Sequence, residues 1–171
     1  MNWPEMLVKL VAIRQHISEK AEGGLYPMTL PEVAAGEDEI LATEKTIGQE
    51  IDARYREFLR YANGWRAFFQ SIDLFGTRQL AGEPNMPFAR AVTSEFDSAV
   101  FEQEFGVSIE GTLPCGVGEQ GDLFLMIVTP GVEKGSVIWA SPTGLVDRWA
   151  NFDEFYAGMV DYNVYLLNSL R

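Results

Sequence analysis

The stretch from Glu44 to Trp65 reads EKTIGQEIDARYREFLRYANGW. Its apolar side chains recur at spacings of four, four, three, one and three residues: Ile47, Ile51, Tyr55, Phe58, Leu59 and Ala62. These spacings place all of them on one stripe of an α-helix. Asn63 and Gly64 then favour a helix end, because both tolerate the left-handed conformation of a helix C-cap. The stretch therefore predicts one continuous amphipathic helix that ends at Asn63-Gly64.

Two further helices are expected near the ends of the chain. The first begins at Pro4, which suits a first helical position, stops before Gly23, and is followed by an extended loop over residues 25–36. The last begins at Asn151, an N-cap residue, with Glu154 in the capping-box position. Broad apolar faces predict that both helices pack onto a core.

The middle of the chain alternates between strand and turn patterns. Ser94 is a plausible N-cap for a helix over residues 95–105, with Asp97 as a capping-box acid, and residues 81–87 are expected to form a loop. Strands are predicted over residues 68–75, 123–128, 135–140 and 145–149.

Gly116, Gly118 and Gly121 spell the spacing G-x-G-x-x-G. Dinucleotide binding needs a strand before this motif and a helix that opens within it. Here an apolar run, Leu123 to Val128, follows the glycines and predicts a buried strand. The motif is therefore interpreted as a glycine-rich turn between two strands.

Composition bounds the class of protein. The chain has 171 residues, 47% hydrophobic and 22% charged, which predicts one globular domain. It carries no signal-peptide pattern and no apolar run near the roughly 20 residues that span a bilayer, so a cytoplasmic location is expected. The single cysteine, Cys115, excludes an internal disulfide and is expected to be a buried small hydrophobe.

The charge is strongly acidic. Thirteen Lys and Arg against 25 Asp and Glu give a net charge of −12, which disfavours binding to nucleic acid and to anionic membranes. Residues 91–133 contain eight acids and no Lys, Arg or His. This segment is either a solubilising surface or a face that steers a basic protein partner.

Several motifs together resemble the SUKH superfamily (the Smi/Knr group). Glu44, a Gly four residues on, Y-x-x-F-L and Asn63-Gly64 resemble its opening motif. Leu74-Phe75-Gly76, Gly121-Asp122 and the F-x-x-F of residues 152–155 follow in the expected order. One departure is Ile51-Asp52, where relatives usually carry Leu-Pro; without the proline, the helix is expected to run straight through.

The resemblance implies an α+β fold. We expect a single domain with a mixed, mostly antiparallel sheet packed against helices and an extra N-terminal helix. Residues 1–36 would form this helix and its loop, packed on the same domain, and residues 37–171 the SUKH-like part. The resemblance also implies a protein-binding role. Most bacterial relatives are immunity proteins that neutralise toxins of polymorphic or contact-dependent systems, often nucleases or deaminases, whereas fungal relatives are regulatory or scaffold proteins.

Catalytic chemistry finds little support in the sequence. His16 is the only histidine and lies near a helix end without partner residues, so no nucleophile–base site is predicted. Glu37-Asp38-Glu39 is interpreted as a solvated charge run, and no metal or cofactor is predicted. A carboxylate-pair glycosidase stays open, because its acids need not be close in the chain. A ligand-binding or catalytic domain would require a pocket with convergent polar groups.

The predicted binding residues divide into acids, aromatic anchors and structural residues. Trp65 and Trp139 are candidate anchors, with burial in the core as the alternative for each. The motif residues Tyr55, Phe58, Leu59, Asn63 and Gly64 are assigned to the fold. The acids expected to face a partner are Glu95, Asp97, Glu102, Glu104, Glu119 and Asp122.

Overall fold

The computed structural model describes residues 1–131 and 133–170. Within these ranges the chain forms a six-stranded sheet in which every neighbouring pair is antiparallel and the strands follow chain order. The strands are β1 (Trp65–Phe69), β2 (Ile72–Leu74), β3 (Thr112–Val117), β4 (Leu123–Ile127), β5 (Val137–Ser141) and β6 (Gly144–Trp149).

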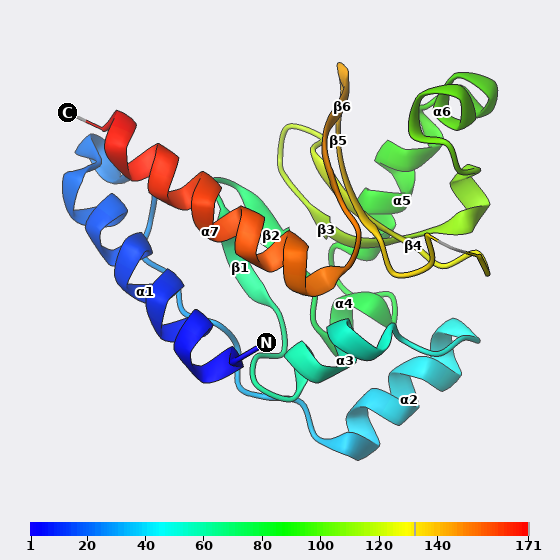
Figure 1. The fold of residues 1–171 in the computed structure, drawn as a ribbon, viewed down its shortest axis with the longest axis horizontal. Helices are drawn as coiled ribbons and strands as arrows, with labels where there is room; N and C mark the ends of the chain where they lie inside the picture. The colour runs from blue at the N-terminus through cyan, green and yellow to red at the C-terminus, as the bar shows by residue number, and fades with distance from the viewer. Residues whose placement is uncertain (132, 171) are drawn as a thin grey trace.

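Helices cover both faces of this sheet (Figure 1). α1 and α7 lie side by side on one face, α5 lies on the other, and α2, α3 and α4 gather at one end. The helices are α1 (Trp3–Lys20), α2 (Glu37–Ile47), α3 (Ala53–Leu59), α4 (Thr77–Leu80), α5 (Met86–Ser94), α6 (Ser98–Phe105) and α7 (Phe152–Ser169), with 3-10 turns η1 (Glu22–Gly24) and η2 (Ile109–Gly111).

An aromatic cluster joins α1, α3 and α7. Trp3 is buried, and its ring centroid lies 5.2 Å from that of Phe58 and 5.1 Å from that of Tyr156. Tyr55 stacks on Phe152 at 4.4 Å. Edge-to-face and offset contacts of this kind add to the stabilisation from apolar burial. The N-terminal helix therefore belongs to the core of the domain, and the α+β prediction is confirmed.

The prediction of one helix from Glu44 to Ala62 is wrong. Gly48, with a φ of 73°, ends α2, and its N–H donates to the carbonyl of Glu44. Asp52 then caps α3: its Oδ1 accepts from the N–H groups of Arg54 at 2.9 Å and Tyr55 at 3.2 Å. Ile51, between the helices, is still buried. The apolar stripe continues across the break because both helices pack on the same core.

Three other boundaries differ from the prediction. The expected strand 68–75 is a hairpin, β1 and β2, turning at Gln70, which has a φ of 50°. Pro87 lies in the first turn of α5 and not in a loop. Ser94 ends α5, with its hydroxyl donating to the Ala91 carbonyl at 2.7 Å, and Asp97 is the N-cap of α6.

The remaining elements match the expectations. α1 covers the predicted N-terminal helix, and β4, β5 and β6 follow the predicted strands within two residues. Asn151 caps α7, since its Oδ1 accepts from the Glu154 N–H at 3.0 Å while its Nδ2 donates to the Glu154 carboxylate at 2.9 Å. Gly118 and Gly121 form the turn between β3 and β4, as predicted in place of a phosphate loop.

Candidate functional site

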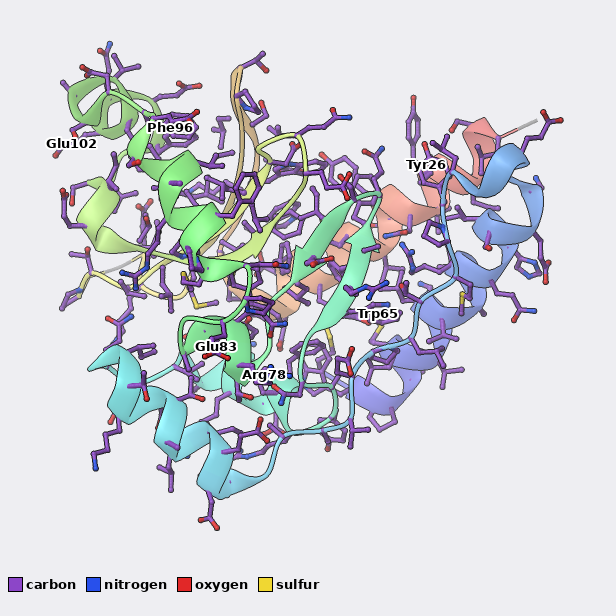
Figure 2. The ribbon with its side chains drawn as sticks, turned by 180° about the vertical axis from the view of Figure 1, so that it is seen from behind. Tyr26, Trp65, Arg78, Glu83, Phe96 and Glu102 are labelled. Atoms are coloured by element: carbon purple, nitrogen blue, oxygen red, sulfur yellow. The ribbon has the colours of Figure 1, made fainter. Side chains whose placement is uncertain are left out.

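A hollow of about 650 Å³ opens where the β1–β2 hairpin, the β3–β4 turn, the start of α5 and the loop after α1 meet. Tyr26, on the loop after α1, is labelled in Figure 2. Polar and apolar residues both line the hollow, which is called the hairpin hollow below. Its lining includes the side chains of Tyr26, Arg66, Asp73, Phe88, Glu119 and Asp122.

Asp73 shapes the wall of the hairpin hollow. Its Oδ1 accepts from the Ala67 N–H at 2.7 Å, and its Oδ2 accepts from Asn85 Nδ2 at 2.6 Å. Burial raises the pKa of the Asp73 carboxyl, and these hydrogen bonds oppose that shift. Ala67 has a φ of 48° and lies where the β1–β2 register shifts. The Asp73 carboxylate therefore holds an irregular backbone in place.

A second hollow of about 370 Å³ lies beside the first and is called the α5 groove. Phe88, Val92 and Phe96 line it on one side, and Gly121 and Pro142 line it on the other. Phe88, Glu119 and Gln120 line both hollows, so these three residues form a shared ridge.

Three of the six predicted acids meet at this ridge. Glu95 lines the α5 groove, Asp122 lines the hairpin hollow, and Glu119 lines both. Asp122 also accepts a hydrogen bond from the Trp139 indole N–H at 2.9 Å. The structure thus gathers acids from the C-cap of α5 and from the β3–β4 turn, which are more than twenty residues apart in the chain.

The other three predicted acids lie on α6 or cap it. Asp97 accepts from the N–H groups of Ala99 and Val100 at the start of this helix. Glu104 accepts from the Leu145 N–H at 2.8 Å and so occupies part of the β6 edge. Glu102 is exposed on α6 (Figure 2). Asp97 and Glu104 therefore have structural contacts, whereas Glu102 faces solvent.

Of the two alternatives for Trp65 and Trp139, exposed anchor or core residue, the structure shows burial in the core. Their side chains are only 1% and 7% exposed. The Trp65 indole N–H donates to Thr29 Oγ1 at 3.2 Å, and the Trp139 ring meets Phe69 edge-on with the centroids 5.4 Å apart. Both indoles therefore belong to the core, with their polar N–H groups satisfied inside the protein.

The aromatic residue that the sequence reasoning missed is Phe88. It is 47% exposed and sits on the ridge between the two hollows. Phe88 and Val92, four residues apart on α5, are a helix-face signal that the sequence contains, and Phe96 follows the end of this helix. It stayed hidden because the start of α5 was assigned to a loop.

The motif residues serve the fold. Tyr55, Phe58 and Leu59 are fully buried, and the Tyr55 hydroxyl donates to the Phe75 carbonyl. Gly64 has a φ of 91°. A Cβ there would lie 2.5 Å from the Gly76 nitrogen, so glycine allows two backbone segments to approach each other.

Asn63 does not act as the predicted helix end. α3 ends at Leu59, with Arg60 as its C-cap, and among the described non-glycine residues only Ala67 and Gln70 have positive φ. The Asn63 side chain instead forms a clasp to α2 and α4. Its Nδ2 donates to Glu39 Oε1 at 2.9 Å and to Thr77 Oγ1 at 2.8 Å, and its Oδ1 accepts from the Thr77 N–H at 2.7 Å.

The reactive residues are placed apart from both hollows. His16 is exposed on α1, with its Nδ1 3.4 Å from a Glu19 carboxylate oxygen. Cys115 is buried in β3, and this burial raises the pKa of its thiol. Among residues 1–131 and 133–170, no three His, Cys, Asp or Glu side chains are grouped so that they could hold a metal ion. Over the same residues, no helix combines the length and hydropathy needed to cross a bilayer.

The fold and the hollows define the class: an α+β protein with an antiparallel six-stranded meander, helices on both faces and a concave acidic surface. The model of the SMI1 / KNR4 family (SUKH-1) matches residues 34–158, which is most of the chain. The chain therefore belongs to the SMI1 / KNR4 family, as its motifs predict. No protein with a curated description matches it.

Proposed function

We propose that the protein is a non-enzymatic binding module that holds a protein partner against the ridge between the hairpin hollow and the α5 groove. The observation that carries this proposal is the convergence of Glu95, Glu119 and Asp122 around the exposed ring of Phe88. A large aromatic side chain ringed by acids is typical of an interface anchor with a polar rim. Membership of the SMI1 / KNR4 family is consistent with a protein-binding role.

The proposed partner is a basic toxin domain, such as a nuclease or deaminase, and the protein is its cytoplasmic immunity protein. The mechanism is stoichiometric occlusion of the toxin's active site or substrate path. A net charge of −12 and the eight acids of residues 91–133 support electrostatic steering of a basic partner. Such steering speeds association and weakens as salt rises, because the Debye length falls from about 10 Å at 0.1 M to about 3 Å at 1 M.

The test is affinity capture from native cell lysate at low and high salt, with mass spectrometry of the retained proteins. We expect one basic partner that is lost as salt rises. The double variant Glu95→Lys/Glu119→Lys should lose this partner at low salt. Glu22→Lys/Glu50→Lys is the matched control with the same change of net charge, since Glu22 and Glu50 are exposed acids that line neither hollow.

The outcomes separate the competing functions. If the double variant retained the partner fully, the ridge would not be part of the interface. A constitutive cellular partner that is not a toxin would favour the regulatory or scaffold role known in fungal relatives. The absence of any partner would redirect attention to a small ligand in the hairpin hollow.

A further inference from the structure

We propose that the α5 groove receives an amphipathic basic segment of the partner, with apolar side chains in the groove and Lys or Arg side chains against Glu95 and Glu119. This inference rests on the proposed function and specifies the chemistry that the partner must present. It concerns the α5 groove alone and not the hairpin hollow.

α5 has two faces. Met86, Ala89 and Thr93 are buried toward the protein interior. Phe88 and Val92, four residues apart on α5, line the groove together with Phe96, which follows the helix. Val92 and Phe96 are partly buried against the core, whereas Phe88 is exposed. The groove therefore presents one exposed ring beside apolar side chains that the core covers only in part.

The residues that border the α5 groove keep it open. The Phe96 ring meets Phe101 edge-on with the centroids 5.5 Å apart, so α6 supports one end. Gly121, with a φ of 88°, lies between Val92 and Pro142. A Cβ there would be 3.3 Å from Pro142 Cγ and 3.7 Å from Val92 Cγ1. Glycine therefore keeps side-chain volume out of the space between the two walls.

The charged residues that line the α5 groove are acidic. Glu95 and Glu119 line the groove, and no Lys, Arg or His is among its lining residues. Both acids are exposed, so a partner can pair with them without first breaking an internal ion pair of the described residues. If the bound segment were apolar and carried no Lys or Arg, these two carboxylates would lie beside it without a positively charged partner. The complementary occupant is an apolar row flanked by basic residues.

The groove is small. Its space of about 370 Å³ is near the lower end of the range of about 300–1,000 Å³ for small-molecule sites. A space of this size suits one or two apolar side chains of an approaching segment. This is the helix-in-groove mode of recognition, in which one apolar face supplies the anchors.

The test uses a fluorescently labelled 14-residue peptide of leucine and lysine, patterned as an amphipathic helix, and an equally charged peptide with glutamine in place of leucine. Fluorescence anisotropy measures binding to the full chain and to two serine variants. Phe88→Ser removes the ring in the groove. Tyr165→Ser is the matched control, because Tyr165 is an aromatic residue 76% exposed on α7. Thermal unfolding checks that both variants stay folded.

We expect saturable 1:1 binding of the leucine–lysine peptide, weakened by about tenfold or more in Phe88→Ser, as expected for loss of an interface anchor, and unchanged in Tyr165→Ser. The glutamine–lysine peptide should bind at least about tenfold more weakly to the unaltered chain. Equal binding of both peptides, or unaltered affinity in Phe88→Ser, would overturn the proposal, because attraction would then be purely electrostatic.

The two proposals fail separately. A natural partner that Phe88→Ser still captures from lysate at low salt, while Glu95→Lys/Glu119→Lys does not, contradicts the groove and leaves the acidic surface intact. Loss of capture in Phe88→Ser but not in Tyr165→Ser supports the groove with the natural partner.

Discussion

Replacing Asn63 tests whether its side chain stabilises the fold through the clasp, its hydrogen bonds to α2 and α4, and not by ending a helix. Asn63→Ala deletes three hydrogen bonds, two donated to Glu39 and Thr77 and one accepted from the Thr77 N–H. Thr77 is 1% exposed, so its N–H would lose its partner where water cannot easily replace it. At a net value of about 1 kcal/mol for each bond, we expect a loss of about 3 kcal/mol in the free energy of unfolding.

The informative comparison is Asn63→Gly. A residue that ends a helix in the left-handed conformation is replaced by glycine without loss, and often with a gain of a few tenths of a kcal/mol or more. A clasp made by the side chain is lost equally in both variants. We therefore expect Asn63→Gly to be at least as unstable as Asn63→Ala, with additional backbone entropy of about 0.5–1 kcal/mol to lose on folding.

Urea unfolding measures both free energies, and calorimetry measures the midpoints. For a domain of this length, about 3 kcal/mol corresponds to a lowering of Tm by about 6–12 °C. Asn168→Ala, at an exposed position on α7, is the control and should stay within about 0.5 kcal/mol of the unaltered chain. An Asn63→Gly variant as stable as the unaltered chain would refute the clasp.

Three other outcomes follow from the same structure. Gly76→Ala should lower the free energy of unfolding by about 3 kcal/mol in urea titrations, because the new Cβ would overlap the carbonyl oxygen of Asn63, and near-normal stability would contradict this packing. Hydrogen bonds from Arg60 and Arg56 lower the pKa of the Glu37 carboxyl from 4.5. The ionised carboxylate therefore adds to the free energy of unfolding above pH 4.5, and this stabilisation is lost as the pH falls through the folded-state pKa. Glu37→Gln should accordingly show a shallower loss of stability below pH 4.5, and parallel pH curves would argue against the ion pairs. The buried Cys115 thiol should not react with a thiol-specific reagent in the native state and should react once per chain in denaturant, whereas rapid native labelling would contradict its burial.

The elements predicted correctly share strong local signals. α7 carries both an N-cap and a capping-box acid, Asn151 and Glu154. The Glu154 N–H donates to Asn151 Oδ1 as expected, while the Glu154 carboxylate accepts from the Asn151 side-chain Nδ2 and not from its backbone N–H. β4 is an apolar run bounded by turn residues, and all five of its side chains are buried. When a segment contains both its own start and stop signals and a clear apolar pattern, its sequence is sufficient to predict the element.

The errors occur where two short elements share one core. Ile47, Ile51 and Tyr55 keep helical spacing although Gly48 and Asp52 separate two helices between them. The spacing of apolar residues indicates which side chains are buried. The buried positions continue through the short link between α2 and α3, so the spacing alone does not reveal the break. The cap signals were present in Gly48 and Asp52, but the apolar stripe outweighed them. The error at Ser94 has another origin: Ser94 and Asp97 both suit an N-cap, and the structure uses Asp97.

The candidate site was harder to predict than the fold, because its residues converge only in three dimensions. Glu95 and Glu119 were both predicted as binding acids, yet only the packing of α5 against β3 brings them to one groove. The tryptophans failed as anchors for the opposite reason. Their size and N–H groups suit an interface and a core equally well, and tertiary contacts decide between these roles.

The motif that identifies the family and the surface proposed to bind the partner use different residues. Tyr55, Phe58 and Leu59 are buried in the aromatic core, and Asn63 holds α2 against α4, so none of the four lines either hollow. Phe88 and the acids around it come from the segment between α4 and β4. Phe88, Glu95 and Glu119 are exposed, so substitutions of these three residues leave the aromatic core contacts intact. The family fold can therefore be retained while the proposed binding surface changes, so under this proposal the choice of partner depends on residues outside the motif.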